Sequence, residues 1–412
     1  MDALLHTPLS TRLWLLREPA RPARIRRSPR APAFAVGTVC VGAFMGQLDA
    51  SIVTLALPRI GAGLGDAAGA VRWVLLAYVL VLALALVPVG LLADRFGRKL
   101  LYTYGFAVFT LGSVLCGLAP ALGWLIAARG LQGLGAAMLQ ANSVALIVES
   151  LPPRMLPRGL GVQGAAQAVG LALGPAIGGL LLALGGWQLI FLVNLPAGLL
   201  GIALAWVLLP RSRTADGQLR GAGQDEPLHV AGAGAPNGAS EELRRGDPGA
   251  APPSAAPRER FDRRALAVGL GGAMVAYAVM FGTLYSVSYH LAALHLPTAL
   301  AGLELAILPV ALGICAPLAG RLAEHVDARV LTLGGPLFAG LGLGVLLMGH
   351  GGGAGLPVGL ALVGAGVGTF IPLNNATVMG AAPRSRVGVL SGILNATRCL
   401  GTALGVALPG VL

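Results

Sequence analysis

The chain has 412 residues, of which 56% are hydrophobic and 11% charged, and its mean hydropathy is +0.78. A soluble globular protein has roughly 25% charged residues, so this composition excludes an ordinary soluble domain. The formal net charge is +12, but most arginines fall between long apolar runs, which fits membrane anchoring and not a nucleic-acid-binding surface. The sequence therefore predicts an all-α, polytopic membrane protein.

The chain opens with a basic tail, residues 1–33, whose longest apolar stretch is too short for a cleavable signal peptide. We expect this tail to lie in the cytosol. After the tail come eleven apolar segments, each long enough to cross a bilayer core of about 30 Å. They cover approximately 34–57, 73–93, 100–119, 123–148, 159–184, 188–209, 265–291, 298–320, 330–349, 355–380 and 387–412.

These segments fall into two groups, which predict two helical bundles. Residues 34–210 hold six segments, and residues 265–412 hold five. Between the bundles, residues 211–264 are rich in glycine, alanine, proline and charge, and have too few apolar residues to build a core. This composition predicts a disordered cytosolic linker.

Basic residues are distributed unevenly over the connections between segments. Alternate connections, including the tail and the linker, carry almost all of them, whereas the opposite connections carry only Arg59 and Arg72. By the positive-inside rule, the N-terminus lies in the cytosol of a multi-pass protein of the cell (inner) membrane.

The two groups of segments also resemble each other in sequence. Gly90 to Lys99 aligns with Gly320 to Arg329, and Gly161, Gly170 and Gly174 align with Gly392, Gly401 and Gly405. Two parallel six-helix repeats are a known transporter plan. By that plan we expect a twelfth helix to be absent, because the chain stops at Leu412 as the eleventh segment ends.

Five regions of the first group resemble the major facilitator superfamily, and within it the multidrug:proton antiporter branch that typically has fourteen spans. The superfamily's signature loop is matched by Gly90-Leu-Leu-Ala-Asp94-Arg95-Phe-Gly97-Arg98-Lys99. Its span 4 motif is matched by Arg129-Gly-Leu-Gln132-Gly133-Leu-Gly135-Ala-Ala137, and its antiporter motif by Gly170-Leu-Ala-Leu-Gly174-Pro175-Ala-Ile-Gly178-Gly179. Elements of the branch are matched by Leu48 to Pro58 and by Trp187 to Gly198.

The resemblance implies a two-bundle transporter that exports small amphipathic compounds in exchange for protons, as in multidrug efflux. It implies a small-molecule substrate, protons and the lipid bilayer as partners, and a proton gradient in place of a cofactor. We expect a monomer that does not bind nucleic acid. A dedicated exporter of one metabolite or antibiotic fits the same motifs, and a truncated membrane protein without transport activity is the alternative from another class.

Two of the motifs predict structural devices. By resemblance, a conformational latch is formed by Gly90, Asp94, Arg95, Gly97 and Arg98, although a plain positively charged turn would need the same residue types. Close helix packing and a hinge between the bundles are predicted for Gly170, Gly174, Pro175, Gly178 and Gly179, because glycines admit a neighbouring backbone and proline bends a helix.

Asp49 and Arg129 are charged residues inside predicted spans. A carboxylate in the middle of a span costs about 2.5–3.5 kcal/mol on insertion scales, and such residues commonly mark proton or ion pathways. We therefore predict that Asp49 and Arg129 couple transport to protons. A hydrogen-bonded packing aspartate and a permanent arginine clamp are the alternatives.

Other polar residues within the segments are candidates for a substrate cavity. Gln132 and Gln140 share the helical face of Arg129, and Asn374 and Asn375 lie in the tenth segment. For Arg398 we favour bonding between helices over a role as the cavity charge. For Glu304 we favour a carboxylate that reaches the membrane interface over binding of a cationic compound.

The sequence shows no pattern typical of an enzyme or a metal site. The four cysteines each lie inside an apolar run, the histidines form no cluster, and no phosphate-binding loop or nucleophile–base pattern stands out. We therefore predict that the protein is not an enzyme and holds no metal.

Overall fold

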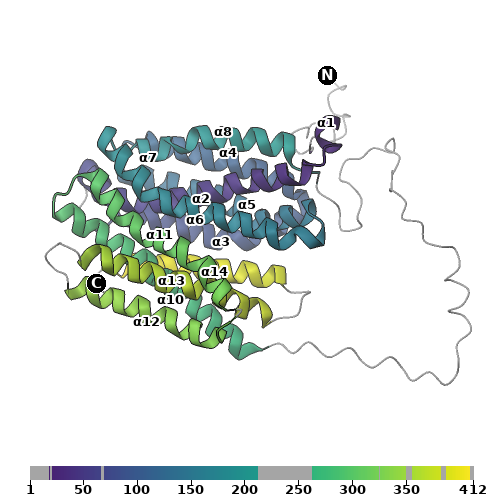
Figure 1. Ribbon diagram of the computed structural model, residues 1–412. Coiled ribbons are helices and arrows are strands. Elements are labelled where there is room, and N and C mark those ends of the chain that lie inside the picture. The colour runs from purple at the N-terminus through teal and green to yellow at the C-terminus, as the bar shows by residue number, and fades with distance from the viewer. Residues whose placement is uncertain are drawn as a thin grey trace, which may run out of the picture.

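The computed structural model describes residue 18 and residues 21–65, 69–211, 262–323, 325–348, 355–381 and 387–408. These residues form long helices that pack as two bundles side by side (Figure 1). The predicted linker, residues 211–264, lies almost entirely outside the described residues, as does most of the basic tail.

The N-terminal bundle follows a single helical turn, α1 (Ala23–Arg26). Its helices are α2 (Ala31–Leu64), α3 (Trp73–Phe96), α4 (Arg98–Gly117), α5 (Leu122–Ser150), α6 (Leu156–Leu184), and a broken last segment made of α7 (Leu189–Leu192) and α8 (Asn194–Leu208). A short 3₁₀ turn, η4 (Pro153–Met155), precedes α6. The C-terminal bundle consists of α10 (Arg263–Ala293), α11 (Thr298–Leu322), α12 (Ala328–Met348), α13 (Gly355–Gly380) and α14 (Val387–Ala407).

The helices confirm the prediction of an all-α membrane protein. In the described part of the chain, 10 helical segments are long and apolar enough to cross a membrane. The segment that ends the chain, α14, has 21 residues but is not among them, and it carries polar residues such as Asn395 and Arg398. The predicted apolar segments therefore correspond closely to the helices.

The internal repeat seen in the sequence is also present in the packing. A Cβ atom at Gly133 of α5 would lie 2.5 Å from the carbonyl oxygen of Tyr78 in α3, and Gly364 of α13 approaches the carbonyl of Leu308 in α11 in the same way. The same correspondence relates the contacts Gly135–Phe109 and Gly366–Ala339, and the contacts Gly170–Phe44 and Gly401–Met274. The two bundles are therefore built on one pattern of close, glycine-dependent helix contacts.

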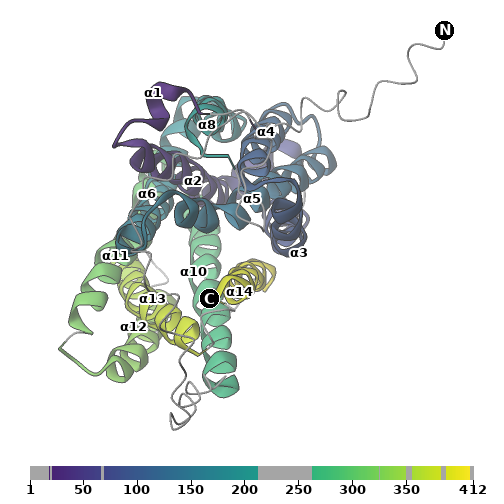
Figure 2. The same ribbon diagram turned by 90° about the vertical axis from the view of Figure 1, so that its right-hand side faces the viewer.

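The bundles contact each other mainly through two helix pairs, α6 with α11 and α3 with α14 (Figure 2). In the first pair, a Cβ at Gly302 would meet the Gly179 Cα at 2.9 Å, so the two backbones lie against each other. In the second, Arg72 Nη1 donates a 3.4 Å hydrogen bond to the carbonyl oxygen of Ala407. Both contacts lie at the end of the molecule opposite to the end where α8 stops and α10 starts.

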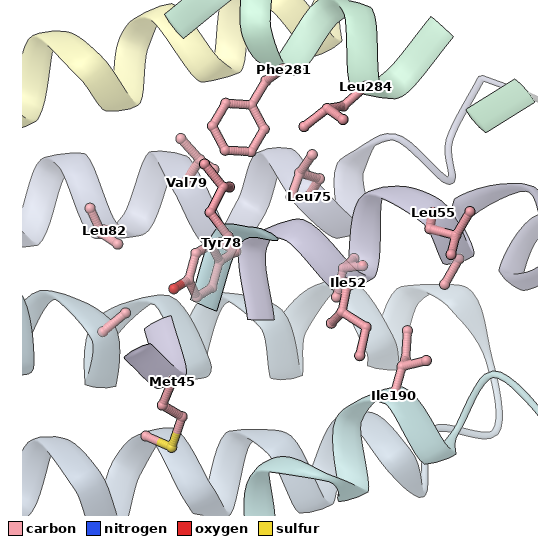
Figure 3. Close-up of a cluster of buried hydrophobic side chains, with 14 of the residues drawn as sticks. Met45, Ile52, Leu55, Leu75, Tyr78, Val79, Leu82, Ile190, Phe281 and Leu284 are labelled. Carbon is pink, nitrogen blue, oxygen red and sulfur yellow. The ribbon is translucent and has the colours of Figure 1, made fainter. Parts of the chain in front are cut away.

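An apolar cluster continues across the boundary between the bundles. Phe281 and Leu284 of α10 point toward Val79 and Leu75 of α3, and all four side chains are buried (Figure 3). The boundary is thus partly closed by ordinary apolar packing.

The repeated glycine contacts predict which glycines tolerate a side chain. Replacing Gly135 by alanine should destabilise the protein by about 1–3 kcal/mol, because the added Cβ would overlap the backbone of Phe109. Gly161→Ala is the matched control, since a Cβ there meets nothing within 4 Å. Thermal unfolding of the purified variants in detergent measures the difference, and equal melting temperatures for the two would contradict the packing described.

Candidate functional site

The centre of the N-terminal bundle holds a fully buried ion pair. Arg129 Nη1 of α5 lies 2.6 Å from Asp49 Oδ2 of α2, and both side chains are 0% exposed. The two sequence-predicted charges are therefore direct partners. An ion pair without access to water is held by direct contacts, because the separated charges would have no solvent to compensate them.

Three uncharged side chains complete the polar cluster around the pair. Gln132 Nε2 donates to Asp49 Oδ1 at 2.9 Å, and its Oε1 accepts from Arg129 Nη1 at 2.7 Å. Asn194 Nδ2 also donates to Asp49 Oδ1, at 3.0 Å, and both amides donate to Ser113 Oγ of α4. The Asp49 carboxylate therefore accepts one charged and two neutral hydrogen bonds.

Asn194 lies at the start of α8, directly after α7. The short helix α7 ends at Leu192 and α8 begins at Asn194. Pro196 has no backbone N–H to donate to Leu192, so it favours a helix start at this point. The Asn194 side chain, which is 1% exposed, points toward Asp49 from this position.

The guanidinium of Arg129 is also bound to α3. Its Nε donates to the carbonyl oxygen of Val74 at 3.0 Å, and its Cζ lies 4.2 Å from the centroid of the Tyr78 ring. Its Nη2 and the Asn194 Oδ1 are buried without a hydrogen-bond partner among the described residues. Each such atom loses hydration that nothing replaces, so the cluster is not fully satisfied in this arrangement.

A cavity of about 310 Å³ lies between the two bundles. This volume is at the lower end of the range typical of small-molecule sites. Amide and hydroxyl side chains line it from both sides, and the N-terminal bundle supplies Gln47, Gln140, Ser143, Gln163 and Gln167. The C-terminal bundle supplies Tyr277, Asn375, Asn395, Arg398 and Thr402.

Arg398 is the charged residue of this cavity lining, and its side chain is half-buried. Its Nη2 donates to Asn375 Oδ1 of α13 at 2.7 Å, and its Nη1 donates to Asn395 Oδ1 at 3.0 Å. Its Cζ lies 5.6 Å from the Tyr277 ring. Arg398 therefore bonds to a neighbouring helix and also belongs to the cavity lining.

The structure divides the other cavity candidates into two sets. Gln140 and Asn375 line the cavity with Arg398. Gln132 lies instead in the buried cluster, and Asn374 Nδ2 donates to the carbonyl oxygen of Gly269. Glu304 is not part of the lining either, and one of its carboxylate oxygens is buried without a hydrogen-bond partner in the described chain.

Tyr78 stands between the cavity and the buried ion pair. It belongs to the cavity lining, and its ring covers the guanidinium of Arg129. Asp49 and Arg129 are not themselves part of that lining. The charged pair is therefore separated from the cavity by one aromatic ring.

The residues of the predicted latch lie at the turn between α3 and α4. Gly97 has a φ of 105°, a conformation that favours glycine, so this turn explains one residue of the motif. Arg98 Nη2 lies 2.9 Å from Asp94 Oδ1, and Arg98 Nη1 lies 3.3 Å from Glu149 Oε1 at the end of α5. Gly90 has open space around it, and Arg95 lies 5.7 Å above the Phe96 ring.

The predicted hinge motif packs on two sides of α6. Gly170, Gly174 and Gly178 face α2, where their nearest neighbours are Phe44, Ser51 and Ile52. Gly179 and the carbonyl of Pro175 face Gly302 of α11, in the other bundle. The motif therefore joins α2 and the opposite bundle through direct backbone contact.

Sequence reasoning missed several residues of the site. Ser113, Asn194 and Tyr78 were not proposed as site residues, and neither were the cavity amides Gln47, Gln163, Gln167 and Asn395. The glutamines carried a usable signal, since Gln163 and Gln167 are one helical turn apart in an apolar helix. The described residues contain no group of three or more metal-ligating side chains.

Comparison with known proteins identifies the family. The family model described as Major Facilitator Superfamily matches residues 39–406. The multidrug resistance protein Stp of Mycobacterium tuberculosis is 32% identical over 90% of this chain and 74% of its own length. The uncharacterized transporter YebQ of Escherichia coli is 30% identical over 92% of this chain and 88% of its own.

A further relative matches over a shorter region of the chain, and solved structures match the fold. The riboflavin transporter RibZ of Clostridioides difficile is 36% identical over 42% of this chain, and the match spans 38% of RibZ. The fold is similar to that of a bacterial homologue of the human lysosomal transporter Spinster, in a crystal structure of its inward-facing, unoccupied conformation. The two structures align over 92% of this chain and 82% of the homologue, with a TM-score of 0.67 and 18% sequence identity. The family match and the full-length relatives show that this chain belongs to the Major Facilitator Superfamily of membrane transporters.

Proposed function

We propose that this chain is a proton-coupled antiporter that exports small amphipathic compounds. The observation that carries the proposal is the buried Asp49–Arg129 pair, one aromatic ring away from a cavity between two bundles. The names of relatives agree with export, since they include a multidrug resistance protein and a methylenomycin A resistance protein.

Protonation of Asp49 is the step that couples the pair to a proton gradient. In the structure the carboxylate compensates the charge of Arg129 directly. A protonated carboxyl group would leave the guanidinium buried with only neutral partners, Gln132 and the Val74 carbonyl. Loss of one partner from a buried ion pair costs about 3–5 kcal/mol, which approaches the 5.5 kcal/mol that moves a two-state equilibrium from 1:99 to 99:1.

Tyr78 connects this chemical change to the cavity. A guanidinium released from Asp49 has the Tyr78 ring on one side and the cavity beyond it. Movement of the ring would change the cavity lining, and a bound compound that holds the ring would in turn hold Arg129 against Asp49. Proton and substrate therefore act on the same side chain from opposite sides.

The contacts between the bundles support alternating access. The bundles touch through Gly179 with Gly302 and through Arg72 with Ala407, all at one end of the molecule. Most of the residues that line the cavity lie in the halves of their helices that are farther from these contacts. In the predicted orientation, these halves are the cytosolic ones. We assign this arrangement to the state that takes up substrate from the cytosol. The Asp94–Arg98–Glu149 contacts of the predicted latch join α3, α4 and α5 within the N-terminal bundle.

A dedicated exporter of a single compound is the second candidate. The cavity of about 310 Å³ is small for a site that accepts many compounds. Two relatives are named for one compound each, riboflavin and methylenomycin A. Transport assays across a panel of dyes and metabolites distinguish the two, because a dedicated exporter would move one chemical class alone.

Asp49→Asn tests the coupling site. The amide keeps the size and polarity of the carboxyl group, but it has one acceptor oxygen in place of two and no charge or titratable proton, so it should imitate the protonated state. In everted vesicles we expect dye accumulation driven by a pH gradient to fall to background. Exchange of labelled for unlabelled dye, which needs no proton turnover, should continue.

Glu304→Gln is the matched control, because Glu304 is another carboxylate within a long apolar helix and lies outside the cavity lining. It should keep both activities. Gradient-driven accumulation by Asp49→Asn at the wild-type rate would refute the coupling role. A wild-type chain that neither accumulates nor exchanges any dye of the panel would instead support the alternative without transport activity.

The ion pair should be needed for function and dispensable for stability. Asp49→Leu leaves Arg129 buried without its partner and should lower stability by about 3–5 kcal/mol. The double variant Asp49→Leu with Arg129→Met should recover most of that loss, because an apolar pair replaces the charged one. Thermal unfolding in detergent measures stability, and vesicle transport should be absent in both variants. A double variant no more stable than the single one would contradict the expectation that the pair is dispensable for stability.

A further inference from the structure

The charge of the cavity differs from that of the buried cluster beside it. Among the lining residues that the structure describes, Arg398 is charged and the remaining polar groups are amides and hydroxyls. A cavity with one cation and several neutral hydrogen-bonding groups attracts anions and repels cations. The charge of the lining therefore indicates which charge a bound compound should carry.

Within the part of the chain that the structure describes, no acidic side chain neutralises the charge of Arg398. Its two hydrogen bonds go to the amide oxygens of Asn375 and Asn395, and no carboxylate of the described residues pairs with it. Its Nε is buried and has no hydrogen-bond partner there. Arg129 shows the contrast, because its guanidinium has the Asp49 carboxylate within 2.6 Å.

An anionic group in the cavity would supply what Arg398 lacks. A carboxylate or phosphate beside the guanidinium would compensate its charge through a charge-assisted contact. Arginine is suited to this task because its planar group presents several donors in a fixed geometry.

The wall next to Arg398 is aromatic. Tyr277 lies under the guanidinium, and its ring stacks on Phe281 at a centroid distance of 6.4 Å and an interplanar angle of 24°. Both residues line the cavity. Such a wall suits a flat, apolar ligand body, because aromatic rings pack well in offset stacks.

The two sides of the cavity differ in charge at one pair of corresponding positions of the internal repeat. Gln167 of α6 and Arg398 of α14 occupy corresponding positions in the two repeats, and both line the cavity. The N-terminal bundle therefore offers a neutral amide where the C-terminal bundle offers a cation. A ligand with one charged end would place that end against the C-terminal bundle.

We propose that the cavity binds planar organic anions, with Arg398 holding the anionic group and the Tyr277–Phe281 wall holding the ring system. This inference rests on the proposed transport function and adds to it the charge class of the substrate. Anionic compounds are selected because they neutralise the cavity, and cationic compounds are rejected because they add to its charge.

The test is equilibrium binding of two dyes to the purified full chain in lipid nanodiscs, followed by fluorescence polarisation. Fluorescein is an anion at mildly alkaline pH and rhodamine 6G is a cation, and the two share a xanthene ring system. We expect wild-type protein to bind fluorescein at least tenfold more tightly than rhodamine 6G. Arg398→Gln should weaken fluorescein binding at least tenfold and leave rhodamine 6G binding equal or tighter.

Two further variants control this result. Arg321→Gln removes the same charge from an exposed position at the end of α11 and should leave both affinities unchanged. Arg398→Lys keeps the charge and should keep the preference for fluorescein, which also covers the case that the glutamine variant fails to fold.

Binding needs no proton gradient, so its outcome is independent of the coupling mechanism. Unchanged fluorescein affinity in Arg398→Gln, a wild-type preference for rhodamine 6G, or no fluorescein binding by wild type would each overturn the anion assignment. Fluorescein binding that depends on Arg398, combined with no gradient-driven transport in vesicles, would support the assignment and refute the proposed antiport.

Discussion

The arrangement of the N-terminal bundle depends on the buried ion pair between Asp49 and Arg129. The pair and its hydrogen bonds join α2, α3, α4, α5 and α8, and each of these helices contributes at least one group. A guanidinium without water can be held only by groups at fixed positions, so these helices cannot shift independently while the pair is intact. The glycine contacts of α5 with α3 and α4 provide the close approach that this arrangement requires.

The two bundles share a backbone pattern but not this chemistry. In the C-terminal repeat, the positions that correspond to Asp49, Arg129 and Gln132 are occupied by Val279, Leu360 and Val363. Leu360 and Val363 are fully buried, so the second bundle fills the same place with apolar packing. The duplicated fold has thus assigned the compensated charge to one half and the uncompensated charge, Arg398, to the other.

Much of this architecture could be predicted from the sequence, because long apolar runs and glycine spacing depend on local residues alone. Asp49 and Arg129 were recognisable because charges inside such runs are rare. Contacts between helices depend on the tertiary arrangement, so nothing local showed that Asn194 would reach Asp49 or that Tyr78 would cover Arg129. Asn374 and Asn375 illustrate the limit, since adjacent residues lie about 100° apart around a helix and only Asn375 faces the cavity.

The single positive charge of Arg398 has an electrical consequence for the proposed cycle. A cavity that is cationic when empty becomes neutral when it holds a univalent anion, so the loaded step moves no charge across the membrane voltage. In the proposed antiport cycle the substrate-free protein then returns with the positive charge of Arg398 and that of the coupled proton, and both move toward the negative interior. Each elementary charge crossing 100 mV is worth about 2.3 kcal/mol, so voltage would drive the resetting of the empty protein and not the outward passage of the compound.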